Sequence, residues 1–340
     1  MSYHKLSIPS NCTKTDDSLF KEKRFEVPRL STYKLSNVEV TFDGICIVDQ
    51  KFLLESVYRY RDNLEECYLS LQFINRCQFL LSEKHILIHS THRDIFHWIT
   101  DSIPRLIMVQ HEIESSTLLI PEGFEQEDFV KESLHLFQIR KVVHIRREES
   151  IRAQHLILPE LKSFYPIFNP SLVTSIRTIY TKWITPQIAR NKSFQSRIYI
   201  ELPVTGPHIV VNKKGIERTL EEFGFTLLDL SKVGFIEGIK AIHKAEFLVG
   251  FDSPNLVYLN FLCSGASVLE LKYPVGNHVD NYAGRYWRLS SCLSLKYYYQ
   301  FGTHRGYYGD ESAKAIEFDT RILCTNLTLM TNRSIKRKGK

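Results

Sequence analysis

The stretch EFLVGFDSPNLVYLNFLCSGASVLELK, residues 246–272, carries the clearest pattern of secondary structure in the chain. Two segments rich in apolar residues, 246–250 and 267–271, have the length of strands, and 254–263 between them is long enough for a helix. A strand, a helix and a second strand in this order predict a βαβ unit with parallel strands. Units of this kind bind ligands at the carboxyl ends of their strands.

The same alternation extends toward the amino terminus of the chain. Strand-rich regions are predicted at 38–50, 77–90, 117–121, 141–145, 155–159, 197–202, 208–211 and 226–230. Helices are predicted at 52–67, 96–112, 125–137, 170–184, 213–223 and 235–244. Strands that alternate with helices favour parallel sheets, so the predicted fold class is α/β with a β-rich extension near the amino terminus.

The domain organisation is predicted from a polar break at 185–196, where Pro186 is expected to close the preceding helix. The length of 340 residues suits two domains of about 100–200 residues each. We predict an irregular segment at 1–36, an N-terminal α/β domain at 37–185, a Rossmann-like domain at 197–310 and a C-terminal segment with a basic tail at 311–340.

The formal net charge of +6 favours an anionic partner, such as a nucleotide, a phospholipid surface or an acidic glycan. No long basic stripe interrupts the chain, so nucleic acid is not a predicted partner. The concentrated positive charge lies in the tail, at Lys336, Arg337, Lys338 and Lys340. This run is interpreted as a solvated terminus, with peripheral contact to an anionic membrane surface as the functional alternative.

The seven cysteines form no Cys-x-x-Cys pair, and their odd number argues against a disulfide framework. A reducing compartment is therefore expected. The first 17 residues are polar and lack the apolar core of a signal peptide, and no run of about 18 apolar residues occurs. The expected location is the cytoplasm, peripheral to the inner face of the membrane if the tail makes the contact described above.

A candidate catalytic group lies in IFHWITDSIPRL, residues 95–106, where His97, Asp101 and Arg105 are spaced four residues apart. On a continuous helix the three side chains would share one face. A carboxylate held by histidine and arginine is suited to general-base removal of a hydroxyl proton. The alternative is that Pro104 begins a new helix, in which case Asp101 is only a helix cap.

A candidate phosphate site follows the strand at 246–250. Ser253 and Asn255 stand where the next helix begins, and the free N–H groups of a helix start attract anions. Asp252 argues against phosphate, because its carboxylate competes for the same donors. Further candidates surround the strand-to-helix turn after 208–211, where cationic and amide side chains could bind a diphosphate: Arg197, Asn212, Lys213 and Lys214.

The motifs that are missing narrow the choice of chemistry. The chain has no G-x-G-x-x-G, no G-x-x-x-x-G-K and no G-x-S-x-G, which argues against dinucleotide enzymes, P-loop proteins and common hydrolases. It also has no Asp-x-Asp, and transferases that hold a nucleotide sugar through a metal ion usually need paired carboxylates. No metal site is therefore predicted, and helix dipoles with basic side chains would neutralise the phosphates.

The segment IHSTHRDIFHWITDSIPRL, residues 88–106, resembles the signature of glycosyltransferase family 61, in which aromatic residues, His-Trp, an acidic residue and Pro-Arg-Leu follow one another. Residues 197–274 resemble the C-terminal domain of that family, and 285–298 resemble the aromatic segment after it. The resemblance implies a GT-B-like architecture of two facing Rossmann-like domains with a cleft between them.

The same resemblance implies an inverting, metal-independent transfer from a nucleotide sugar, expected to be UDP-linked, to a glycan or lipid-linked glycan acceptor in surface or capsular polysaccharide biosynthesis. It implies Asp101 as the catalytic base, with His97 as the alternative. Arg105 is assigned to the donor with the candidates above, and Glu270 is expected to bind the nucleotide ribose.

This chain departs from the family pattern at the presumed phosphate site. The family has two arginines, a histidine and glycines that let the backbone approach the phosphate closely, and this chain lacks them. The sequence Asp-Ser-Pro-Asn at 252–255 stands where the family has the histidine and the glycines. Two functions therefore stay open from the sequence: an active glycosyltransferase, or a non-catalytic glycosyltransferase-like subunit that binds a glycan or a partner enzyme.

Overall fold

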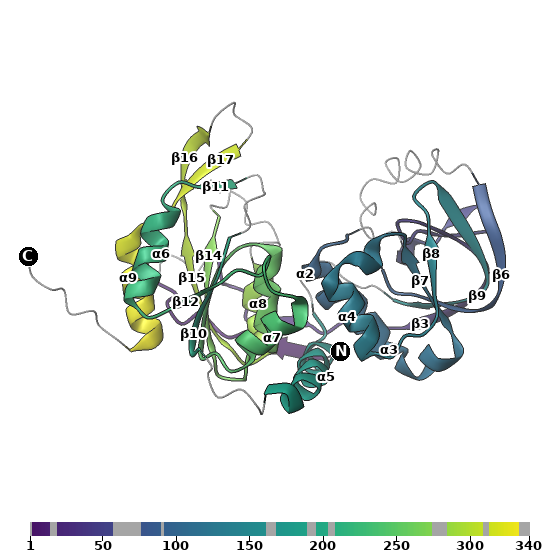
Figure 1. Cartoon of the computed structure of the whole chain (residues 1–340), viewed down its shortest axis with the longest axis horizontal. Helices are drawn as coiled ribbons and strands as arrows, with labels where there is room; N and C mark the ends of the chain where they lie inside the picture. Colours follow the sequence, from purple (N-terminus) through teal and green to yellow (C-terminus); the bar gives the residue numbers. More distant parts are fainter. Residues whose placement is uncertain are drawn as a thin grey trace, which may run out of the picture. The chain divides into compact units, whose positions relative to one another are not determined.

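A computed structural model of the chain describes residues 2–13, 19–56, 76–89, 92–160, 168–188, 195–202, 208–273, 284–308 and 313–332. The chain divides into two compact units. Pro28–Phe164 forms the N unit, and Met1–Val27 together with Tyr165–Lys340 forms the C unit. Figure 1 shows the helices and strands of each unit.

The N unit contains a mixed seven-stranded sheet in the order β5-β4-β3-β9-β6-β7-β8. Strands β9, β6, β7 and β8 are parallel to one another, whereas β3, β4 and β5 add in antiparallel fashion beyond β9. The strands are β3 (Thr32–Thr41), β4 (Cys46–Val48), β5 (Lys51–Phe52), β6 (Arg76–Leu87), β7 (Thr117–Pro121), β8 (Val142–Ile145) and β9 (Glu149–Pro159).

Local sequence explains these strands well. All five residues of β7 are buried, as is typical of a parallel strand covered on both faces. The turn between β3 and β4 contains Gly44 at φ 77°, a conformation that glycine adopts at little cost. A Cβ at this position would also lie 2.9 Å from the carbonyl oxygen of His89, so this close approach requires glycine as well.

Most helical segments of the N unit follow its parallel strands, whereas η1 follows the antiparallel β5. A continuous helical segment after β6 consists of α2 (Ile95–His97), the π-helix η2 (Trp98–Ser102) and α3 (Ile103–Met108). The remaining segments are η1 (Leu54–Ser56), η3 (Gln110–Ser115), η4 (Phe124–Gln126) and α4 (Asp128–Leu136). Most of the helix predicted at 52–67 lies outside the described residues.

The C unit is built on a parallel five-stranded sheet in the order β12-β10-β13-β14-β15. In chain order this is 2-1-3-4-5, an open doubly wound arrangement in which the chain changes direction between β10 and β13. Ligands of such sheets bind at the carboxyl ends of the strands beside this point. The strands are β10 (Arg197–Ile200), β12 (Thr226–Leu228), β13 (Phe247–Phe251), β14 (Ser267–Lys272) and β15 (Lys296–Phe301).

Helices cover both faces of this sheet (Figure 1). On one face α6 (Lys213–Glu222) and α9 (Thr320–Thr331) pack with alternate strand residues, Val249, Leu269 and Tyr298 among them. The other helical elements are α5 (Pro170–Ile188), α7 (Phe235–His243), η5 (Pro254–Phe261) and α8 (Arg285–Cys292). A smaller sheet has the order β11-β17-β16, formed by His208–Val210, Ala313–Glu317 and Thr303–Tyr308.

The observed units differ from the predicted domains in the assignment of helix α5. Its residues belong to the C unit because Arg177 donates to the carbonyl oxygen of Leu293 at 2.8 Å. The buried Tyr180 ring of α5 also packs against Phe235 and Phe261. Pro186 does not close this helix as predicted, since α5 continues to Ile188 with the proline in its last turn.

The N-terminal segment, predicted to be irregular, contains two short strands and packs against the rest of the C unit. Strands β1 (Tyr3–Lys5) and β2 (Arg24–Glu26) pair in antiparallel fashion. The side chain of Asn11 donates to the carbonyl oxygen of Tyr299 at 2.7 Å and accepts from its N–H at 3.2 Å. The indole N–H of Trp287 donates to the carbonyl oxygen of Ser7. These partners lie far apart in sequence, so local periodicity could not reveal them.

Within the described part of the chain, no helix has the length and apolar character that would let it cross a membrane.

Candidate active site

The candidate site of the N unit lies on the helical segment that follows the carboxyl end of β6. Pro104 has no N–H to continue the α-helical pattern, and the segment accommodates it through the π-helical turn η2. In this turn the N–H of Ile103 reaches back five residues to the carbonyl oxygen of Trp98. The helix is therefore neither an uninterrupted α-helix nor a new helix after Asp101, the two alternatives that the sequence left open.

Two buried aromatic residues anchor this segment on either side of His97. Phe96 and Trp98 are almost fully buried, and the indole N–H of Trp98 donates to the hydroxyl of Ser133 on α4 at 3.1 Å. The Trp98 ring also packs edge-on against Phe124. The backbone on both sides of His97 is thus fixed, while its own side chain keeps 12% of its surface exposed.

His97 and Asp101 form a short hydrogen bond, with 2.6 Å between Nδ1 and Oδ2. Asp101 is 5% exposed, and its other carboxylate oxygen lies 3.4 Å from the hydroxyl of Thr100. A carboxylate can only accept, so Nδ1 of His97 carries the proton in this bond. When the imidazole is neutral, Nε2 is therefore the unprotonated nitrogen, which carries the lone pair.

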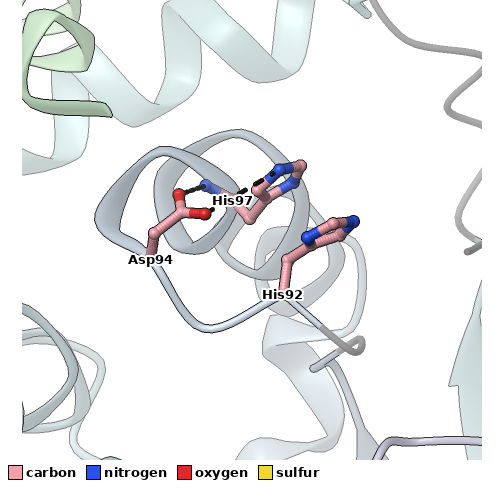
Figure 2. Close-up of side chains that lie close together, drawn as sticks. All are labelled: His92, Asp94 and His97. Carbon is pink, nitrogen blue, oxygen red and sulfur yellow. Dashed lines mark hydrogen bonds and ion pairs between the residues drawn. The ribbon is translucent and has the colours of Figure 1, made fainter. Parts of the chain in front are cut away.

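Two residues that the sequence analysis did not single out, His92 and Asp94, complete this group (Figure 2). Asp94 caps the helix, accepting the N–H of His97 at 3.0 Å through Oδ1. Its Oδ2 lies 4.0 Å from Nε2 of His97. The His92 ring stacks on the His97 ring with 4.0 Å between centroids and 12° between planes. The spacing His-x-Asp-x-x-His at 92–97 is the sequence signal that could have revealed the group.

Arg105, predicted to bind the donor, is buried in the N unit instead. Its guanidinium donates to the carbonyl oxygens of Ile88 at 2.7 Å, His89 at 3.0 Å and Pro159 at 2.8 Å. Burial lowers the pKa of Arg105 to about 10, and Asp101 partly offsets this effect. The side chain ties the chain just after β6 to the end of β9, so it supports the site without being placed to contact a ligand.

His89 is a second buried support beneath the site. Its Nδ1 lies 3.2 Å from the carbonyl oxygen of Leu119, and its Nε2 lies 3.3 Å from that of Phe42. Burial and the nearby charge of Arg105 lower the pKa of His89 to about 3, so the ring is neutral at physiological pH. The two contacts connect β7 with the end of β3.

In the C unit, a charged group gathers at the carboxyl ends of β13 and β14. Asp252, directly after β13, pairs with Arg285 at 2.5 Å and lies 4.0 Å from Nζ of Lys272. Ser253 and Asn255 stand at the start of η5, and the Tyr286 hydroxyl donates to the carbonyl oxygen of Ser253. Arg285 and Lys272, which sequence reasoning missed, are thus the cations beside the predicted phosphate site.

Glu270, the residue expected to bind the ribose, is fully buried within this group. It pairs with Lys272 at 2.8 Å and accepts a short hydrogen bond from the Tyr297 hydroxyl. Burial raises the pKa of Glu270, although Lys272 acts in the opposite direction. In this arrangement its carboxylate is committed to protein partners, and no side-chain surface is left for a ribose.

The residues predicted around α6 separate in the structure. Asn212 bonds both backbone groups of Phe318, donating to its carbonyl oxygen at 2.6 Å and accepting its N–H at 3.2 Å. Lys213 pairs with Glu201 at 2.8 Å, and although burial disfavours its charge, these contacts raise its pKa. Lys214 is exposed on the first turn of α6.

Arg197 lies at the opposite edge of the C-unit sheet from Ser253 and Asn255. It is the first residue of β10, so it stands at the amino end of the parallel strands. Its guanidinium donates to the carbonyl oxygen of Phe223, the residue that ends α6. The direction of β10 therefore separates Arg197 from Asp252 and Ser253 at the carboxyl edge.

Comparison with known proteins places these features in a family of enzymes. The family model described as Glycosyltransferase 61 matches residues 95–269, just over half of the chain. The matched range begins at the first residue of α2 and ends in β14, so it includes the His97–Asp101 pair and the carboxyl end of β13. The chain is a glycosyltransferase, and it belongs to glycosyltransferase family 61. No significant match to a curated protein was found.

Proposed function

We propose that the protein transfers a sugar from a nucleotide-sugar donor, UDP-linked, to a hydroxyl of a glycan or lipid-linked glycan acceptor, with inversion and without a catalytic metal ion. Membership of the family supports the donor and acceptor classes in general terms. The observation that carries the mechanism is the 2.6 Å hydrogen bond between His97 and the buried Asp101.

We assign the general base to His97, with Asp101 as the residue that orients it. The family resemblance had implied Asp101 as the base and His97 as the alternative. Asp101 is buried behind the imidazole, whereas His97 is partly exposed. A carboxylate on Nδ1 holds the imidazole in the tautomer whose Nε2 can accept a proton, and it stabilises the imidazolium that results. A base of this kind removes the acceptor hydroxyl proton as the new glycosidic bond forms.

For the donor, we propose that Arg285, whose side chain is 17% exposed, contacts the leaving diphosphate, and that Lys272, which is only 1% exposed, adds positive charge without touching it. Both lie at the carboxyl edge of the C-unit sheet, the edge that binds ligands in doubly wound sheets. Asp252 pairs with Arg285 in the structure described here, so we infer that the diphosphate displaces the Asp252 carboxylate from Arg285. Two fixed cations make a metal-free mechanism chemically reasonable.

The GT-B arrangement, the role in surface or capsular polysaccharide biosynthesis and the cytoplasmic location remain parts of this proposal. The basic tail at 336–340, which would make the membrane contact, lies outside the described residues. The charge of +6 supports an anionic partner in general terms.

The first test is a binding screen with a chelator present throughout. The melting temperature is measured with UDP-sugars, other nucleotide sugars and the free nucleoside diphosphates, because a ligand specific for the folded state must raise it. We expect a rise with at least one UDP-linked donor. No rise with any ligand at millimolar concentration would refute the proposed donor class.

The second test measures transfer from the donor found in this way. Asp101→Asn should lower kcat by on the order of 10²–10⁴, because an amide no longer fixes the correct tautomer of His97. The donor-induced rise in melting temperature should persist, since the change lies in the N unit. His111→Gln is the control, because His111 is an exposed histidine of the same unit. Unchanged turnover in Asp101→Asn would overturn the assignment.

A further inference from the structure

We propose that His92, Asp94 and His97 form a binding site for a divalent transition metal of the zinc class, and that metal bound there inhibits transfer. The binding half of this proposal depends on the three side chains alone. The inhibition half rests on the function proposed above for His97. The experiments below keep these two halves apart.

The chemistry of the three side chains suits such a metal. One ligand atom from each of the three lies within 4.8 Å of the other two (Figure 2). Two imidazole nitrogens with one carboxylate oxygen form a donor set that zinc accepts, with a fourth position left for water. Magnesium and calcium prefer oxygen ligands throughout, so the histidines select against them.

The hydrogen bond between His97 and Asp101 is a second, independent feature of a metal site. Histidine ligands typically donate their other ring N–H to a carboxylate, which fixes the tautomer and raises the basicity of the coordinating nitrogen. Asp101 holds Nδ1 of His97 in this way at 2.6 Å. The electron pair of the neutral ring is then on Nε2, the nitrogen that lies 4.0 Å from Oδ2 of Asp94.

Two of the three ligands are held in place before metal binds. His97 stands on a helix whose neighbouring residues, Phe96 and Trp98, are buried. Asp94 is held by its cap bond to the N–H of His97, made through Oδ1, so Oδ2 remains on the side of the imidazole. Preorganised ligands lose less conformational entropy on binding.

Metal binding requires a small rearrangement in which His92 moves most. Ligand atoms at 2.0–2.1 Å from zinc are about 3.3 Å apart in a tetrahedral site, so the group must contract by on the order of 1 Å. A metal also lies in the plane of each imidazole, whereas the two rings are stacked at 12°. One ring must turn, and we infer that it is the His92 ring, because His97 is held by its bond to Asp101.

The consequence for transfer follows from the electron pair on Nε2. A metal ion coordinated there uses the same pair that would accept the hydroxyl proton of the acceptor. No covalent bond in either substrate forms or breaks on metal binding, so removing the metal should restore the base. Zinc should therefore act as a reversible inhibitor, and a chelated enzyme should be the active form.

The binding experiment uses the full chain after chelator treatment, titrated with Zn²⁺ by calorimetry and with Co²⁺ by visible absorption. We expect wild-type protein to bind both ions, and His92→Gln and Asp94→Asn to bind at least about tenfold more weakly. Asp94→Asn keeps a cap acceptor, since asparagine is an equally good helix cap. His111→Gln, at an exposed histidine, should bind as wild type does.

Two binding results would overturn the site. The first is wild-type affinity in both His92→Gln and Asp94→Asn, with folding of each variant checked by its melting temperature. The second is a Co²⁺ spectrum with the thiolate charge-transfer band in the near ultraviolet, unchanged in His92→Gln, which would assign the metal to cysteines instead.

The inhibition experiment compares transfer with and without Zn²⁺, each variant being measured against its own activity in chelator. Wild type should lose most of its activity in Zn²⁺ and regain it on chelation, and His92→Gln should lose much less. If zinc binds through His92 without slowing transfer, the inhibition half is wrong and His97 is not the base. If chelated wild type transfers nothing, the proposed function fails while the binding result stands.

Discussion

Replacing Arg105 with methionine distinguishes a structural role from the role in donor binding that the sequence suggested. Methionine is long enough to fill most of the space and has no donor group. The change removes all three hydrogen bonds to the carbonyl oxygens of Ile88, His89 and Pro159. These oxygens lie at the ends of β6 and β9, directly beneath the segment that carries His97.

The size of the effect follows from two opposing terms. Hydrogen bonds from a charged donor contribute about 1.5–3 kcal/mol each, so the loss of three costs about 5–9 kcal/mol. Against this stands the cost of burying the cation. The pKa of Arg105 falls from 12.5 to about 10, so at neutral pH the charged form is disfavoured in the folded chain by about 3 kcal/mol. Methionine removes this cost, and the expected net loss of stability is about 2–6 kcal/mol.

The assay is equilibrium unfolding in urea, followed by tryptophan fluorescence in a background that carries Trp183→Phe and Trp287→Phe. The one remaining tryptophan, Trp98, is buried in the N unit and reports on that unit. Arg105→Met should lower the free energy of unfolding by about 2–6 kcal/mol, and Arg105→Lys by less, since an ammonium keeps some of the bonds. An unchanged unfolding curve together with a large rise in KM for the donor would refute the structural role.

Two further predictions concern buried groups. Lys272→Met should lower the melting temperature by roughly 10 °C, because a buried Glu270 without its cation costs about 3–5 kcal/mol. The double variant that also carries Glu270→Gln should recover part of this loss. An unchanged melting temperature in Lys272→Met would contradict the pairing. Burial raises the pKa of the Cys46 thiol to about 12, so at pH 8 its alkylation in the folded chain should be on the order of 10³-fold slower than that of an ordinary thiol. Mass spectrometry of the alkylated peptides would measure this against the exposed Cys263, and equal labelling of the two would show that Cys46 is accessible.

The regular elements were predictable wherever short-range pattern decides them. The predicted strand at 117–121 coincides with β7, and the strand at 267–271 is one residue shorter than β14. Both have the length and the high apolar content of a strand, and both are buried throughout. The N-terminal segment was missed because its contacts, such as that of Asn11 with Tyr299, join residues that are 288 positions apart.

The candidate site was predictable where helical spacing holds. The spacing of four residues correctly brought His97 and Asp101 together. The same spacing failed for Arg105, since the π-helical turn after His97 alters the phase of the helix and directs that side chain into the interior. Arg197 is misplaced for another reason: as the first residue of a parallel strand it lies at the amino edge of the sheet, whereas ligands of such sheets bind at the carboxyl edge.

The place of the N unit within the chain has a consequence for folding during synthesis. Residues 28–164 are inserted into the C unit, whose first segment precedes them and whose remainder follows. The N unit can complete its sheet once Pro159 has left the ribosome, because all of its strands are then present. The segment up to Val27, in contrast, can form only its own β1–β2 pair at that point, because its contacts with the rest of the C unit need later residues such as Trp287 and Tyr299. We therefore expect the segment up to Val27, although it is made before the N unit, to become protected from proteolysis after it.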